Sequence, residues 1–336
     1  MIGLEARLCF FLALGLALVG SYALAGPKYV FWGVDPVGGP RQDHPEDFSP
    51  AFFEATRARF EVPDNPDLKF GLTFIFSIME GSPEKLAESL RQVCVSSEET
   101  GIPILLTLES QNWWTTRPEL WNWWDPALPG YDPANAENVE WTSWDPKDAV
   151  QISWRNWGMQ IRIKPAQNLF ARRVMAEVFA RLKLLVPILA DWYESLPPDQ
   201  KWLFRGVKLG SEACIGGNAF YYPGGNNYLE RWPEDTSNDP AWWPRHEEGL
   251  SSGAAQIGYA ALASSGLKTS GEITRDDLAR LIQLYVEVLC RKTHSLGLPT
   301  ELITTHLGGT HQPYELHMPL WPAFNQWADT VGYSMY

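Results

Sequence analysis

Several patterns that would assign a function directly are missing from this 336-residue sequence. It has no block of Lys or Arg, and its formal net charge is −13, which argues against a nucleic-acid-binding surface. No GxGxxG or GxxxxGK[ST] motif follows the first predicted strand, so a nucleotide site is not indicated. The HExxH and CxxC patterns of zinc proteases and zinc sites are also missing. We therefore expect neither a cofactor nor a metal.

Cysteine is scarce, with only Cys9, Cys94, Cys214 and Cys290 present. If the N-terminal segment with Cys9 is removed on export, three cysteines remain and at least one thiol is free. Cys94 and Cys290 lie in helical patterns, which predicts that both are core residues. One disulfide remains possible.

Long hydrophobic runs are absent except at the N-terminus. Arg7 precedes an apolar run, residues 8–25, that ends in the small-x-small sequence Ala-Leu-Ala at 23–25. A membrane anchor needs about 20 uninterrupted apolar residues, whereas two glycines and a serine interrupt this run. The pattern favours a signal peptide over residues 1–25 and a secreted or otherwise exported protein that is not held in a membrane after cleavage.

The rest of the chain alternates between short apolar runs and helix-period segments. The predicted strands are 28–35, 68–77, 102–110, 202–212 and 301–309, and a sixth starts at 331–336. The predicted helices are 49–60, 82–101, 166–196 and 274–297. Buried strands that alternate with helices indicate a parallel sheet. We expect one α/β domain over 26–336, a (β/α)8 TIM-barrel-like fold that is incomplete because only about six strands are present.

Local signals place the ends of these helices. Ser-Pro pairs at 49–50 and 82–83 and a Thr274–Asp277 capping box predict N-termini, and Gly101 and Gly297 predict C-termini. Pro187 predicts a kink in the third helix.

Two connections are much longer than is usual for this architecture. Residues 111–164 and 213–273 follow the third and fourth strands, at the face where barrel enzymes build their sites. Nine of the 17 tryptophans lie between Trp113 and Trp157. Indole faces stack well on sugar rings, but large amphipathic aromatics also pack loops onto a domain. We expect most of the nine to pack the loops and a few to face a ligand.

Each of four predicted strands ends in a polar residue that could face one cavity: Asp35, Glu109, Glu212 and His306. Hydrolysis of a glycosidic bond needs two carboxyl groups, one protonated and one ionised. Glu212 follows an apolar strand, and apolar walls raise the pKa of a carboxyl so that it keeps its proton near neutral pH. These residues therefore predict a glycosidase site.

The segment GVKLGSEACIGGNAFYYP, residues 206–223, resembles the fourth-strand segment of clan A glycoside hydrolases, the retaining (β/α)8 barrels related to β-galactosidases and cellulases. The resemblance implies that Glu212 is the acid/base. The clan has Asn directly before this Glu, and this chain has Ser211 there. The clan's nucleophile ends strand seven, and no residue of this chain matches it.

Two interpretations of the second carboxylate stay open. Glu109 could act as the base in an inverting arrangement, or the nucleophile could lie beyond Tyr336 if the sequence is a fragment. Glu109 could equally bind substrate or have a structural role. The candidate substrate-binding residues are Asp35, Asn112, Trp113, Trp114, Asn218, Tyr221, Tyr222 and His306. Asp35 could instead be a structural acceptor and His306 a core histidine.

The leading hypothesis is an exported glycoside hydrolase that acts on an oligo- or polysaccharide. A non-catalytic carbohydrate-binding barrel, either a pseudoenzyme or an inactive fragment, is the alternative. A metal-dependent hydrolase is disfavoured because the predicted strand ends lack histidine clusters. The sequence gives no oligomeric state.

Overall fold

A six-stranded sheet in which every neighbouring pair is parallel forms the centre of the molecule. The computed structural model describes residues 27–34, 39–60, 67–111, 114, 116–151, 153–156, 160–163, 165–210, 215, 217–218, 255–306 and 325–332. The strands of this sheet are β1 (Lys28–Gly33), β2 (Leu68–Ser77), β3 (Ile104–Glu109), β6 (Phe204–Leu209), β9 (Ile303–His306) and β10 (Thr330–Gly332). All six predicted strands are confirmed, with ends that differ by a few residues.

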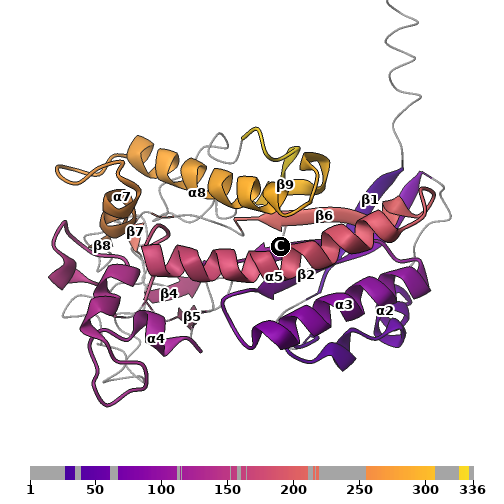
Figure 1. Cartoon of the computed structure of the whole chain (residues 1–336), viewed down its shortest axis with the longest axis horizontal. Coiled ribbons are helices and arrows are strands. Elements are labelled where there is room, and N and C mark those ends of the chain that lie inside the picture. The colour runs from indigo at the N-terminus through magenta and orange to yellow at the C-terminus, as the bar shows by residue number, and fades with distance from the viewer. Residues whose placement is uncertain are drawn as a thin grey trace, which may run out of the picture.

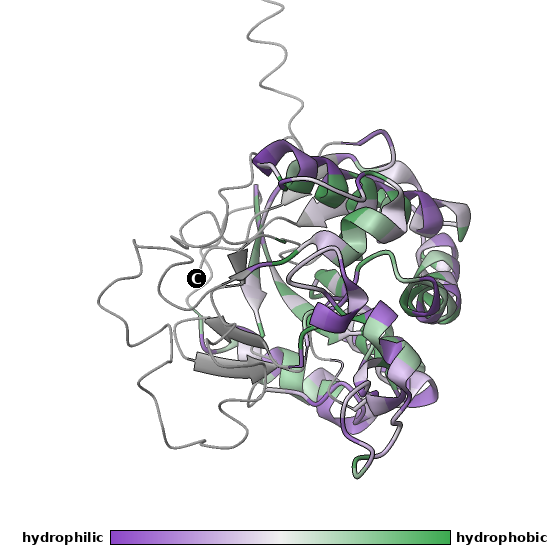
Figure 2. Cartoon of the chain, turned by 90° about the vertical axis from the view of Figure 1, so that its left-hand side faces the viewer, coloured by the Kyte–Doolittle hydropathy of each residue, from purple (hydrophilic) through white to green (hydrophobic). Residues whose placement is uncertain are grey.

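The strands lie side by side in chain order, β1-β2-β3-β6-β9-β10. Right-handed crossovers that always step in the same direction place their helices on the same face of a sheet. Figures 1 and 2 show this arrangement, with α3 (Pro83–Thr100), α5 (Arg172–Ser195) and α8 (Arg275–Ser295) on one side. The predicted α/β fold with a parallel sheet is therefore confirmed.

The helix ends follow the local signals in the sequence. The Ser49 side chain accepts the Phe52 N–H at the start of α2 (Pro50–Arg57), and Ser82 caps α3 in the same way. The Thr274–Asp277 capping box is present in full at the start of α8. Gly101 ends α3 in the left-handed conformation, with φ 64°. The helix α5 continues through Pro187.

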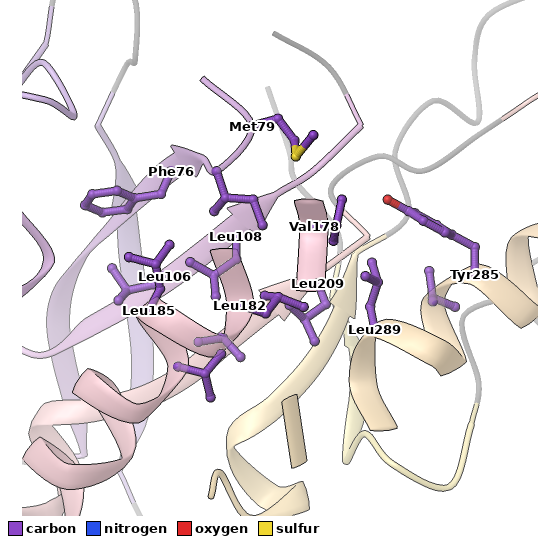
Figure 3. Packing of buried hydrophobic residues seen from close by; sticks show 14 of the residues in the cluster. Phe76, Met79, Leu106, Leu108, Val178, Leu182, Leu185, Leu209, Tyr285 and Leu289 are labelled. Carbon is purple, nitrogen blue, oxygen red and sulfur yellow. The ribbon is translucent and has the colours of Figure 1, made fainter. Parts of the chain in front are cut away.

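The core lies between the sheet and these helices. Leu106 and Leu108 of β3 and Leu209 of β6 pack against Leu182 and Leu185 of α5 (Figure 3). Side chains alternate between the two faces of a strand. Thr107 and Glu109 of β3 and Lys208 of β6 alternate with these core residues along their strands and therefore lie on the sheet face away from the helices, which we call the inner face.

Both helix cysteines belong to this core, as the sequence predicts. Cys94 and Cys290 are buried and free, so no disulfide joins them. Burial raises the pKa of both thiols, that of Cys290 to about 12, which keeps them protonated. Cys214 lies outside the described residues.

Contacts across the inner face indicate that the sheet is curved. The guanidinium of Arg205, at the start of β6, lies 4.4 Å from the ring centroid of Tyr29 in β1, although β2 and β3 separate the two strands. The ring of Phe31, also in β1, lies over Gly71, where a Cβ would come within 2.4 Å of it. The side chains of Arg205 and Tyr29 can meet across two intervening strands most easily when the sheet face that carries them is concave.

Several small elements inside the long connections were not predicted from the sequence. An antiparallel pair, β4 (Ser153–Asn156) and β5 (Gln160–Ile163), lies in the first connection. A second pair, β7 (Gly217–Asn218) and β8 (Ala255–Gln256), lies in the other connection. The short helices α4 (Pro118–Trp121) and α7 (Tyr259–Ser265) belong to the same two segments. Figure 1 shows all of these elements at the end of the molecule to which the carboxyl ends of the central strands point.

The predicted signal peptide, residues 1–25, lies outside the described residues. Among the helices that the structure describes, none combines the length and the apolar character that crossing a bilayer requires.

Candidate active site

Glu109 is the last residue of β3 and lies at the carboxyl edge of the sheet. Its side chain is 2% exposed. Its Oε1 atom accepts the backbone N–H of Gln111 at 2.6 Å, and its register partner on β2 is Ser77. A buried carboxyl held in one orientation at the end of a parallel strand fits a catalytic or ligand-binding role.

A buried hydroxyl pair adjoins Glu109. Ser110 Oγ and Tyr285 Oη, the latter from α8, are 2.7 Å apart. Burial raises the pKa of Tyr285, its hydrogen bond with Ser110 lowers it, and the charge of Glu109 raises it, with a net upward shift that keeps the phenol neutral. Sequence reasoning missed Tyr285 because it lies within the regular apolar pattern of a helix.

A second cluster of polar side chains lies at the carboxyl end of β2. Gln42 Oε1 accepts the Ser77 N–H at 2.8 Å, and Gln42 Nε2 donates to Ser77 O at 3.3 Å and to Glu80 Oε2 at 3.4 Å. Burial raises the pKa of Glu80, and the negative charge of Asp43 raises it further. Glu80 is thus a carboxyl near the edge of the sheet whose pKa lies above its ordinary value.

Glu80 was not predicted from the sequence because only polar residues at the ends of the predicted strands were considered as candidates, and β2 ends at Ser77, three residues earlier. The sequence signal that could have identified Glu80 is an acidic residue in the first turn after a buried strand.

The other predicted strand-end residues are placed only in part. His306 is the last residue of β9 and pairs in register with Gly332 of β10, and Asn218 is the last residue of β7. The predicted site residues outside the described part of the chain are Asp35, Asn112, Trp113, Glu212, Tyr221 and Tyr222.

The structure places Trp114 in the core. Its side chain is 2% exposed, and its indole N–H donates to Pro165 O at 3.0 Å. Stacking on a sugar needs an exposed ring face, so the predicted substrate contact of Trp114 does not fit this position.

Other tryptophans of the first connection also have packing roles. Trp121 and Trp141 are buried, and the indole N–H groups of Trp121, Trp123 and Trp141 donate to backbone carbonyls at 2.7 to 3.0 Å. The N–H of Trp144 donates to Gly271 O at 2.8 Å and so joins the two long connections. The expectation that most of these indoles pack the connections is confirmed for those described.

No group of three His, Cys, Asp or Glu side chains that could hold a metal ion occurs within the part of the chain that the structure describes. Comparison with known proteins found no family model and no curated protein that matches the chain. The chemistry of the residues at the sheet edge is therefore the basis for a functional proposal.

Proposed function

We propose that this protein is an exported glycoside hydrolase that cleaves an oligo- or polysaccharide by carboxylate acid/base catalysis on a (β/α)8-type barrel. Glu212 would serve as the acid/base and Glu109 as the ionised second carboxylate.

The adjacency of β3 and β6 is the observation that carries this proposal. The two strands pair directly in parallel, so their carboxyl ends lie side by side. Glu109 ends β3, and Glu212 follows the last residue of β6 by three positions in the sequence. A glycosidase needs two carboxyl groups on either side of one bond, and neighbouring strand ends can supply them.

The curvature of the sheet supports the barrel. A sheet in chain order with its helices on one face has the topology of a (β/α) barrel wall, and the contact between Arg205 and Tyr29 fits a concave inner face. The two long connections leave the carboxyl ends of β3 and β6, where such a barrel would hold its substrate.

The test is hydrolysis of a panel of aryl glycosides by the whole protein. We expect turnover by the wild type, a fall of at least about 100-fold in kcat for Glu212→Gln and for Glu109→Gln, and retained saccharide binding in both. Glu137→Gln is the matched control, because Glu137 is an exposed carboxylate of the first connection. The anomer released first, followed by NMR, distinguishes an inverting reaction with Glu109 as base from a retaining one.

Two results would contradict the proposal. The first is a lack of turnover on every glycoside together with saccharide binding that Glu212→Gln leaves unchanged, which would favour the non-catalytic carbohydrate-binding barrel. The second is turnover that both Gln variants retain in full.

A further inference from the structure

A lysine occupies the middle of the inner face, where a charged side chain is unusual. Lys208 is the fifth residue of β6, one of the two central strands of the sheet, and it is half-buried. Its neighbours on the same strand, Val207 and Leu209, are fully buried on the helix face. A partly buried ammonium group interacts more strongly with a nearby acidic group than one in bulk water does, because water screens it less.

The register of the sheet shows which residues flank Lys208. Thr107 of β3 lies directly opposite it on one side, and Thr304 of β9 lies opposite it on the other. Glu109 is two residues beyond Thr107 on the same strand and therefore on the same face. With ordinary strand spacing and rise, the Cα atoms of Lys208 and Glu109 are about 8 Å apart, and the flexible four-carbon stem of a lysine can span such a separation.

A nearby cation would favour the ionised form of the Glu109 carboxyl. Its side chain is 2% exposed, and burial alone favours the neutral form of a carboxyl. Among the described neighbours, α8 contributes the neutral phenol of Tyr285, and β2 contributes Ser77 with the half-buried carboxyl of Glu80 beyond it. None of these groups carries a positive charge. The adjacent strand β6 contributes two basic residues to this face, and Lys208 lies nearer than Arg205 to its carboxyl end, where Glu109 lies.

From this placement we infer that Lys208 is a positioning residue of the site, whose ammonium keeps the Glu109 carboxylate ionised. The inference rests on the proposed function, because it explains how one carboxyl of the pair stays ionised while the other keeps its proton. Lys208 would thus fix which of the two carboxyl groups serves as base or nucleophile.

The experiment is an NMR titration of the carboxyl carbons in protein labelled at glutamate, with the Glu109 signal identified by its loss in Glu109→Gln. In Lys208→Met we expect the titration midpoint of Glu109 to rise by about one pH unit. Lys208→Arg, which keeps the charge, should hold it near the wild-type value. Lys69→Met is the matched control, since Lys69 lies on the inner face of β2 with its ammonium 4.6 Å from the ring of Trp202.

A Glu109 midpoint that Lys208→Met leaves unchanged, or that Lys69→Met shifts by the same amount, would overturn the inference. The titration needs no substrate, so it stays decisive even if the wild type hydrolyses no glycoside and the proposed function fails. If the enzyme is active, the acid limb of its pH–rate profile should move upward with the Glu109 midpoint in Lys208→Met and return in Lys208→Arg.

Discussion

The side chain of Glu140 accepts the backbone N–H of Gly258 at 2.9 Å, although the two residues are 118 positions apart in the chain. It also accepts the N–H groups of Ala260 and Ala261 at the start of α7. Helix N-termini leave N–H groups without intrahelical partners, and the two oxygens of a carboxyl group can accept hydrogen bonds from them. Glu140, a buried residue of the first long connection, therefore holds the N-terminus of α7, a helix of the second long connection, by hydrogen bonds.

The burial of Glu140 makes the stability of the protein depend on pH. Burial raises its pKa from 4.5 to about 8, even though the backbone N–H groups of Gly258, Ala261, Trp141 and Ala260 lower it. Between these values the folded protein holds a proton that the unfolded chain releases, so the free energy of unfolding falls as pH rises through this window. Below pH 4.5 and above about pH 8 the contribution of Glu140 is constant.

We expect the free energy of unfolding of the wild type, measured with urea at a series of pH values, to fall by on the order of a few kcal/mol more than that of Glu140→Gln between pH 4.5 and 8. Glu137→Gln removes an exposed carboxylate from the same connection and should keep the wild-type slope. Parallel curves for the wild type and Glu140→Gln would show that Glu140 titrates at its ordinary value in the folded state.

Gly206 occupies a position that only glycine fits. Its φ is 101°, and a Cβ on it would lie 2.1 Å from Leu302 O, next to the register shift between β3 and β6. We expect Gly206→Ala to lower the free energy of unfolding by roughly 3–5 kcal/mol, because both the backbone and the neighbouring chain must move. Urea denaturation measures the change.

Gly266→Ala is the control for this prediction. Gly266 also has a positive φ of 74°, but a Cβ added to it would lie within 4 Å of no residue beyond its immediate neighbours in the chain, so we expect a loss of only about 1–2 kcal/mol. Equal losses in the two variants would mean that the contact with Leu302 is relieved at little cost.

Trp114 should behave as a structural residue. Trp114→Phe removes the hydrogen bond to Pro165 O and leaves unfilled volume in the core, so we expect a loss of roughly 1–3 kcal/mol in the free energy of unfolding. Saccharide affinity, measured by calorimetry on the folded variant, should stay within about twofold of the wild type, which is well under about 1 kcal/mol. A large drop in affinity at unchanged stability would restore the stacking role that the sequence suggested.

Local sequence was enough to predict where the strands of the sheet and the helices between them lie along the chain, and where many of these elements begin and end. Buried strands show as short apolar runs, and the Ser49, Ser82 and Thr274 caps bond to N–H groups of residues close to them in the chain. The predicted parallel sheet followed from the alternation of these elements. The burial of Cys94 and Cys290 followed from their positions in helical patterns.

Which side chains meet depended instead on the tertiary structure. Tyr285 reaches Ser110 across 175 positions, Glu140 reaches α7, and the indole of Trp114 is buried rather than open to a ligand. These outcomes depend on how the long connections fold against the sheet, and an aromatic or acidic residue has the same local signature whether it packs, caps a helix or faces a substrate. The sequence supplied the candidate carboxylates, whereas the parallel pairing of β3 with β6 set them on adjacent strands, because register is fixed by contacts between distant segments.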